Sequence, residues 1–149
     1  MNVFTGARLL LVSLLALGML HDSRAIAESF NTLAGGVKIR DFKAGEGNPA
    51  QVGDIATIHV RGWLDEDGAR GRSFFNSRDE GRPVSFVIGD DGVMEGWNVG
   101  VVGMRSGGQR MLLIPPGMAY GARAIEDIIP ANAALMMHIE LIHLQPAEQ

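Results

Sequence analysis

Cysteine is absent from this chain of 149 residues, and its absence excludes several kinds of site. The protein has no disulfide framework, no thiol nucleophile, no cysteine-ligated zinc and no lipid-modified cysteine anchor. Basic residues are also few, because 13 Lys and Arg stand against 17 Asp and Glu and give a net charge of −4. Sequence-independent binding to nucleic acid depends on clustered Lys and Arg. We therefore expect no nucleic-acid partner.

The usual motifs of covalent, phosphate and metal chemistry are absent as well. No Gly-x-Ser-x-Gly elbow and no Gly-x-x-x-x-Gly-Lys loop occurs. His59, His138 and His143 have no paired metal-ligand spacing. His138 and Glu140 would share one face of a strand, where a metal pair is conceivable, but the pattern favours a solvated or capped histidine. We expect no metal, no cofactor and no covalent catalytic residue.

The N-terminus has the pattern of a signal peptide. Leu9 to Leu20 is an unbroken apolar run that is too short to span a bilayer. Ala25-Ile26-Ala27 follows it with the small-x-small pattern that signal peptidase cleaves. We expect residues 1–27 to be removed, in preference to an uncleaved anchor or a core helix. The prediction is a chain exported to the periplasm or the medium, with no membrane attachment after cleavage.

The remaining sequence predicts one domain over residues 37–144, with a loose leader over 28–36 and a polar tail over 145–149. Alternating apolar and polar residues predict strands. Such strands cover residues 37–40, 56–61 with an ending at 62–64, and 84–88. An apolar strand is predicted over 109–114, and a long alternating strand starts at 135. An acidic, glycine-bearing turn is predicted over 65–71.

One helix is predicted between the third and fourth of these strands. Val93, Trp97, Val101 and Met104 recur at a spacing of three to four residues and form one apolar stripe. Glycines at positions 96, 100 and 103 each cost the helix roughly 1 kcal/mol against alanine, which is tolerable if the helix lies close against a sheet. The predicted fold class is therefore α+β, several antiparallel strands with a short helix covering one face.

The most prominent candidate site is aromatic. Phe74, Phe75, Phe86, Trp97 and the single tyrosine, Tyr120, supply apolar surface with few polar groups. Tyr120 lies in a predicted loop beside Gly121, where a core role is less natural than for the others. A concave apolar pocket with a few polar groups is typical of a site for a small ligand or peptide.

Several ordered motifs resemble one known family. They are Ile58 to Leu64, Phe74 to Arg82, Val93-Met94-Glu95-Gly96-Trp97, Gly107 to Arg110, Ile114-Pro115-Pro116, Ala119-Tyr120-Gly121 and Ile128-Ile129-Pro130. Together they resemble the FKBP family of peptidyl-prolyl cis/trans isomerases from about Val37 to Leu144. The resemblance implies a twisted antiparallel sheet wrapped around one short helix, an apolar pocket between them, and rotation about the peptide bond preceding proline.

The resemblance also assigns pocket positions. It implies that Trp97 forms the floor and Phe74 one wall, with Val93 beside them. Met94 would offer its backbone N–H, Tyr120 its hydroxyl, and Ile129 would lie near the pocket on a loop.

Four pocket positions depart from the family pattern. Val60 and Met137 stand where tyrosine and phenylalanine are usual, and Val84 stands where phenylalanine is frequent. Phe75 replaces an aspartate if the alignment has no gap through Pro83 and Phe86, which the spacing favours. A register shifted by one residue would put Asn76 in the place of the aspartate. Because neighbouring residues on a strand point to opposite faces, we expect this choice to decide whether Phe74 or Phe75 lines the pocket.

These observations predict an isomerase that acts on Xaa-Pro bonds of exported proteins. Its expected partners are proline-containing unfolded or partly folded polypeptides, with macrolides as further candidate ligands, and we expect a monomer. The alternative is a peptide-binding or chaperone module with a weak or vestigial isomerase site, which the altered pocket positions would explain.

Overall fold

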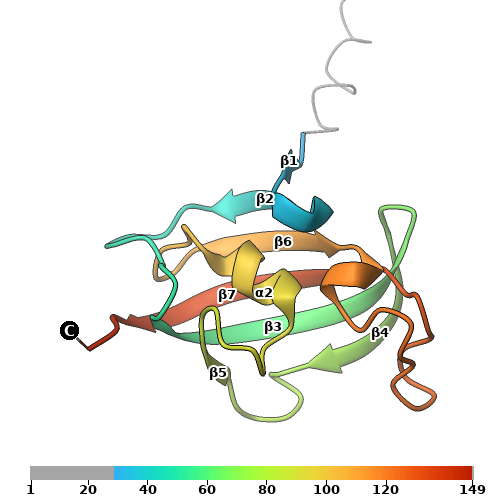
Figure 1. The fold of residues 1–149 in the computed structure, drawn as a ribbon. Helices are drawn as coiled ribbons and strands as arrows, with labels where there is room; N and C mark the ends of the chain where they lie inside the picture. The colour runs from blue at the N-terminus through green and yellow to red at the C-terminus, as the bar shows by residue number, and fades with distance from the viewer. Residues whose placement is uncertain (1–28, 149) are drawn as a thin grey trace, which may run out of the picture.

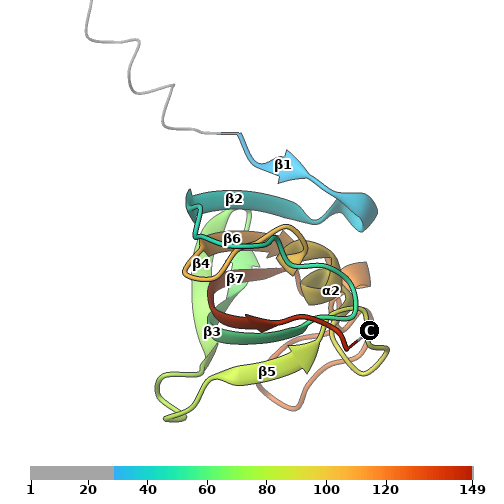
Figure 2. The same cartoon turned by 90° about the vertical axis from the view of Figure 1, so that its left-hand side faces the viewer.

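The computed structural model describes residues 29–148, so the expected signal peptide lies outside the described residues. Seven strands form one sheet in the order β1-β2-β6-β7-β3-β4, and β5 also pairs with β3. The elements in chain order are β1 (Asn31–Thr32), the 3-10 turn η1 (Ala34–Gly36), β2 (Lys38–Lys43), β3 (Ile55–Glu66), β4 (Ala69–Asn76), β5 (Val84–Val87), α2 (Glu95–Val101), β6 (Gln109–Ile114), the 3-10 turn η2 (Pro116–Met118) and β7 (Leu135–Gln145). Every strand pair is antiparallel. The sheet curves around α2 (Figures 1 and 2), which confirms the predicted fold class.

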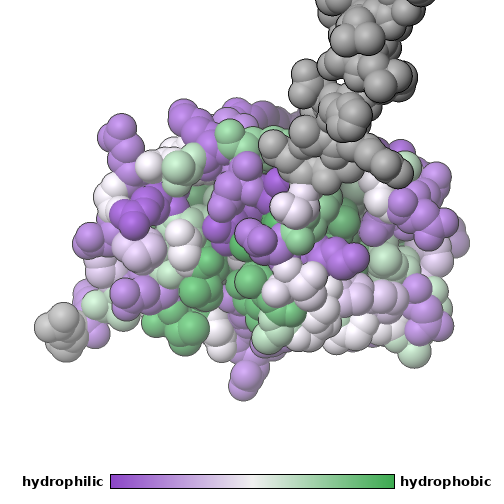
Figure 3. All heavy atoms as spheres, turned by 90° about the horizontal axis from the view of Figure 1, so that it is seen from above, coloured by the Kyte–Doolittle hydropathy of each residue, from purple (hydrophilic) through white to green (hydrophobic). Residues whose placement is uncertain are grey.

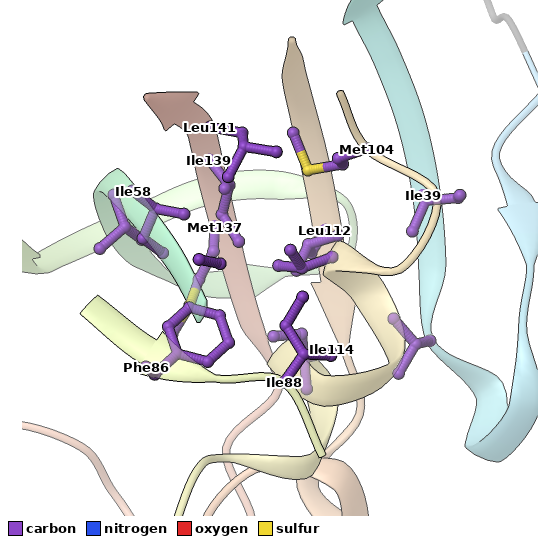
Figure 4. Packing of buried hydrophobic residues seen from close by; sticks show 14 of the residues in the cluster. Ile39, Ile58, Phe86, Ile88, Met104, Leu112, Ile114, Met137, Ile139 and Leu141 are labelled. Carbon is purple, nitrogen blue, oxygen red and sulfur yellow. The ribbon is translucent and has the colours of Figure 1, made fainter. Parts of the chain in front are cut away.

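The apolar core lies between the sheet and α2. Side chains that point inward from β3, β5, β6 and β7 meet there (Figure 4). The predicted inner face of β7 is confirmed, since Leu135, Met137, Ile139 and Leu141 are all buried. These residues alternate along β7 because only one face of a strand can contribute to a given core.

Two glycines allow α2 to lie close to the sheet, as predicted. A Cβ atom at Gly96 would come within 2.5 Å of Ile114 Cγ2, and one at Gly100 within 2.6 Å of Leu112 Cδ1. Any larger residue at these positions would push the helix away from β6 or force its neighbours to move. The close approach is the physical reason why a seven-residue helix contains two residues of low helix propensity.

A buried arginine closes the C-terminal end of α2. Arg110, only 6% exposed, donates from Nη1 to the carbonyl oxygens of Gly100 and Val102 at 2.9 and 3.0 Å. Its Nε and Nη2 donate to the two carboxylate oxygens of Asp41 at 2.6 and 3.0 Å. Carbonyl groups at a helix end have no partner within the helix, so Arg110 joins the end of α2 to strands β2 and β6.

The hairpin of β3 and β4 is longer than predicted. β3 continues through Trp63 to Glu66, and the only turn residues are Asp67 and Gly68. Both have positive φ, 54° and 85°, as a tight type I′ hairpin turn requires. The predicted strand ending at 62–64 and the predicted turn over 65–71 are therefore wrong, because a two-residue turn lets the polar flanking residues pair as strand.

The expected loose leader and polar tail both make contacts with the rest of the domain. β1 pairs with β2 through Asn31 and Ile39, and Phe30 packs against buried side chains on the outer face of the sheet. At the other end β7 runs to Gln145, and the Ala147 N–H donates to Asp54 Oδ1 at 3.1 Å. Both segments are held by contacts with residues far away in the sequence.

The surface mixes polar and apolar residues. On the face seen in Figure 3, hydrophilic side chains interrupt the hydrophobic areas. No helix within residues 29–148 is both long enough and apolar enough to cross a membrane.

Candidate functional site

A cavity of about 550 Å³ lies where the sheet, α2 and the β6–β7 connection meet. The walls come from β3, β4, β5 and β7, from the turn before α2, from α2 itself and from the loop after Pro116. The lining residues are Val60, Gly62, Phe74, Phe75, Val84, Ser85, Phe86, Gly92, Val93, Met94, Trp97, Tyr120, Ile125, Ile128, Ile129 and Met137. Every pocket residue predicted from the sequence is in this set. The cavity also includes Phe86, which belonged to the aromatic candidate set, and it adds Gly62, Ser85, Gly92, Ile125 and Ile128.

Trp97, which α2 carries, has a fixed orientation in the cavity. Its ring contacts that of Phe86, with centroids 5.4 Å apart and planes inclined at 42°. Its indole N–H donates to Met137 Sδ. A thioether sulfur is a weak acceptor, yet it gives the half-buried indole a partner inside an apolar site. Met137, one of the departures from the family pattern, is thereby part of the support for Trp97.

Phe74 and Phe75 both line the cavity, contrary to the expectation that only one of them would. Gly62 pairs with Phe75 whereas Trp63 pairs with Ser73, so Phe74 is an extra residue in β4. Such a β-bulge suspends the alternation of side chains. Gly62 makes it possible, because a Cβ atom there would lie 2.5 Å from Phe74 Cζ.

A buried serine supports this wall from behind. Ser77 is fully buried, and its hydroxyl oxygen accepts the Val60 N–H at 2.9 Å. The same Oγ lies 2.9 Å from His59 Nδ1. This network ties the end of β4 to the β3 residue that lines the cavity. Its signal in the sequence was a small polar residue two positions after Phe75, which composition alone does not distinguish from a turn residue.

The opposite wall comes from the long loop between η2 and β7. Ile129 is 4% exposed and packs into the core, whereas Tyr120 and Ile128 are each 40% exposed at the rim. The Gly121 N–H donates to the Pro116 carbonyl at 2.8 Å, and the Asn132 N–H donates to the Gly121 carbonyl at 2.7 Å. These bonds close the base of the loop and set Tyr120 at the cavity.

None of the described residues that line the cavity carries a charge. The polar groups there are few, chiefly the Tyr120 hydroxyl and the backbone around Met94. The Ser85 hydroxyl lies 2.8 Å from that of Thr57 on the outer face of the sheet. No hydrogen bond within residues 29–148 uses the Met94 N–H. The site can therefore hold an apolar ring and donate one or two hydrogen bonds, but its lining offers no strong base and no charged group for general acid catalysis.

The histidine considered for a metal pair lies elsewhere. His138 is on the outer face of the sheet, where its ring is 5.9 Å from that of Phe42. Burial is the main cause that lowers its pKa, the Arg70 guanidinium adds to this, and Glu140 opposes it. The Glu140 carboxylate is paired with Arg78 at 2.7 Å. No group of three potential metal-ligating side chains occurs within the described part of the chain.

Comparison with known proteins relates this chain to a family. The family model described as FKBP-type peptidyl-prolyl cis-trans isomerase matches residues 46–142. The chain belongs to this family. It is 38% identical over 108 residues to an FK506-binding protein of Neisseria meningitidis serogroup B, which covers 72% of this chain and 95% of that protein. The chain spans only 21% to 30% of the length of four insect and fungal FK506-binding proteins that it also matches.

Solved structures of FKBP-type proteins share the fold. FkpA from Escherichia coli aligns with a TM-score of 0.71 and 31% identity over 84% of this chain and 56% of that one. A peptidyl-prolyl cis-trans isomerase from Pseudomonas syringae pv. tomato aligns with a TM-score of 0.68 and 27% identity over 78% of this chain and 81% of that one. The FKBP-type sheet, wrapped on one helix, is thus present here with an apolar cavity between its layers.

Proposed function

We propose that this chain catalyses cis/trans isomerisation of Xaa-Pro peptide bonds by holding the proline ring in the cavity beside Trp97. The observation that supports this most is the cavity itself, which is apolar, uncharged and of a volume usual for small-ligand sites. Membership in a family of peptidyl-prolyl isomerases points to the same reaction.

The chemistry of the reaction suits such a site. Rotation about an amide bond is opposed by a barrier of roughly 18–20 kcal/mol, which arises from resonance between nitrogen and carbonyl. A twisted amide has lost that resonance and is less polar than the planar form, so a dry apolar cavity stabilises it relative to the ground state. No bond to carbon is made or broken, and no acid, base, nucleophile or metal is needed.

The polar groups at the rim would orient the substrate. Tyr120 and the unused Met94 N–H lie on different walls of the cavity, and each can donate to a carbonyl oxygen flanking the proline. Trp97, supported by Met137, would form the surface under the ring.

We further propose that the substrates are exported proteins. Support comes from the sequence, in the apolar run Leu9 to Leu20 and the cleavage pattern that ends at Ala27. Intact-mass analysis of the protein from cell fractions tests this. A chain beginning at Glu28 outside the cytoplasm is the expected result, and an intact Met1 in the cytoplasm would overturn it.

A second candidate function has one observation in its favour. Val60 and Phe75 both line the cavity. The wall therefore has an aliphatic group where tyrosine is usual for the family and, in the alignment without a gap, an aromatic group where aspartate is usual. This favours a peptide-binding or chaperone module with a weak isomerase site, which would protect a proline-free unfolded client from aggregation.

A protease-free assay on Xaa-Pro peptides with the chain from Glu28 separates these functions. Trp97→Ala is expected to lower kcat/KM at least about tenfold, because a loss of ~1.4 kcal/mol in transition-state binding has that effect. Tyr120→Phe, which removes one donor, is expected to have a smaller effect. Trp63→Phe, on the outer face of the sheet, is the matched control, and an FK506-type macrolide is the competing ligand. A folded wild type without catalysis would overturn the proposal and favour the binding module.

A further inference from the structure

One arginine joins the two walls of the cavity. Arg72 lies on β4, two residues before Phe74. Its Nη1 donates to the carbonyl oxygen of Asp127 at 3.1 Å, and its Nη2 donates to that of Ile128 at 2.6 Å. The acceptors are consecutive backbone carbonyls at the tip of the loop between η2 and β7.

The loop tip depends on this connection. The segment Ile125–Ile129 is closed by its own bonds, from the Ile125 N–H to the Ile129 carbonyl at 2.8 Å and from the Ile128 N–H to the Ile125 carbonyl at 2.9 Å. Within residues 29–148, the two bonds from Arg72 are the only hydrogen bonds that attach this tip to the sheet. Packing anchors the two ends of the tip, because Ile129 is 4% exposed and Ile125 packs against the core, whereas Ile128 between them is 40% exposed.

The other end of the connection also needs support. β4 pairs only with β3, and that pairing has register shifts on both sides of Trp63. The Phe74–Phe75 wall therefore stands on an irregular edge strand, and Arg72 joins this strand to the loop across the cavity mouth.

We propose that Arg72 is a positioning residue that holds the Ile125–Ile129 tip against the Phe74–Phe75 wall and so sets the width of the cavity mouth for the substrate. The inference rests on the proposed isomerase function of the same cavity. Arginine suits the role because its planar guanidinium presents two N–H groups to two neighbouring acceptors, whereas lysine offers a single flexible ammonium. Since the acceptors are backbone atoms, the side chains of the tip remain available to line the cavity.

Loss of the connection should act on binding more than on rotation. If the tip moves away from the wall, only a fraction of the molecules can bind substrate at any moment. The apparent affinity for substrate then falls in proportion to that fraction. The groups beside the amide, Trp97 and Tyr120, are not attached through Arg72. We therefore expect Arg72→Ala to raise KM about three- to tenfold, from the modest net value of two hydrogen bonds, and to leave kcat within about twofold.

The test compares Arg72→Ala and Arg72→Lys with Arg105→Ala in the chain from Glu28. Arg105 is the matched control because its guanidinium also donates to a backbone carbonyl, that of Gly47, away from the cavity. Steady-state kinetics with an Xaa-Pro peptide are combined with amide hydrogen exchange at Ile125, Ile128 and Ile129. The expected result is a higher KM and faster exchange at the tip in Arg72→Ala, partial recovery in Arg72→Lys, and no change in Arg105→Ala. Amides in β6 and β7 should remain protected in all three variants.

Every other outcome of this test would contradict one stated part of the proposal. Unchanged exchange at the tip would overturn the connection itself. Faster exchange with an unchanged KM, or a loss confined to kcat, would overturn the role in positioning while leaving the contact in place. If the wild type folds but does not catalyse, the isomerase proposal fails separately. The exchange data and the affinity for the same peptide, measured by titration, then decide whether Arg72 sets the cavity mouth.

Discussion

The two faces of the sheet cover their apolar residues in different ways. On the inner face, Ile58, Leu112 and Ile139 are fully buried in the core between the sheet and α2. On the outer face, Trp63, Met111 and Met136 are 8%, 5% and 4% exposed, although the described residues place no helix over them. Phe30 and arginine side chains take the place of a covering layer there.

The outer arginines lie on aromatic rings. Arg61 and Arg70 are 5.1 and 4.6 Å from the ring centroid of Trp63, and Arg40 is 4.6 Å from that of Phe42. Arginine can bury its aliphatic stem on apolar surface while its guanidinium stays hydrated, and the attraction to a ring face adds to this.

The difference shows where a binding site can arise. A flexible arginine cover can adapt to the surface below it and fill the gaps between side chains. On the inner face, the cover is one seven-residue helix, α2. The apolar surface beside Trp97 that α2 does not cover forms the cavity. The site is thus the part of the inner face that α2 is too short to cover.

The largest expected effect compares two neighbours on β6. Leu112→Ala, on the inner face, should lower the free energy of unfolding by about 3–4 kcal/mol, because the residue is fully buried and rigid neighbours cannot fill the space. Met111→Ala, on the outer face, should cost about 1–2 kcal/mol, because flexible arginine stems can move into the gap. Urea unfolding monitored by circular dichroism measures both. Equal losses would show that the outer cover is as rigid as the helix.

The next comparison sets a buried arginine against an exposed one. Arg110→Met should cost about 2–3 kcal/mol, because it leaves the Gly100 and Val102 carbonyls and Asp41 without their donor. This is less than for a fully buried pair, since the Asp41 side chain is 51% exposed and can hydrate. Arg61→Met, on the outer face, should cost no more than about 1 kcal/mol. Both are checked by the same urea titration, and a costly Arg61→Met would mean that the arginine cover holds the sheet together.

The inner face could be predicted from the sequence far better than the outer one. Alternation identified β7, an apolar run identified β6, and the glycines at 96 and 100 correctly indicated a close helix. Trp63 was predicted only as the end of a strand. Its burial depends on Arg70, which lies on β4 and covers the Trp63 ring. The two-residue turn between β3 and β4 was missed because the acidic residues around it predicted a longer turn.

The candidate site shows the same limit. The resemblance supplied positions such as Trp97 and Tyr120, which do line the cavity. Strict alternation failed at Phe74 and Phe75, because the bulge over Gly62 is a contact between strands and not a local pattern. Arg72 could not be found at all, since its acceptors are backbone atoms 55 and 56 residues away and backbone acceptors leave no signature in the sequence.

The smallest expected effect is the pH dependence of stability that His138, on the outer face, causes. Burial first, and then the nearby Arg70 guanidinium, lower the pKa of His138 below its ordinary value of 6.5, with Arg78 acting in the same direction and Glu140 in the opposite one. The unfolded chain therefore takes up a proton at a higher pH than the folded protein does. The stability linked to His138 is intact above the ordinary pKa and is lost as the pH falls through that value toward the lower folded pKa.

Replacing the histidine should remove this dependence. His138→Gln is expected to lose less stability than the wild type between about pH 7.5 and about pH 5, a range on either side of the ordinary histidine pKa, when urea unfolding is measured at both ends. His143→Gln, at an exposed histidine near the end of the same strand, is the matched control. Arg70→Met should raise the pKa of His138, followed by NMR, without restoring it fully, because burial remains. A pKa that returned to its ordinary value in Arg70→Met would mean that the arginine cover acts on the outer face mainly through its charge, and an unchanged pKa would mean that it acts by excluding water.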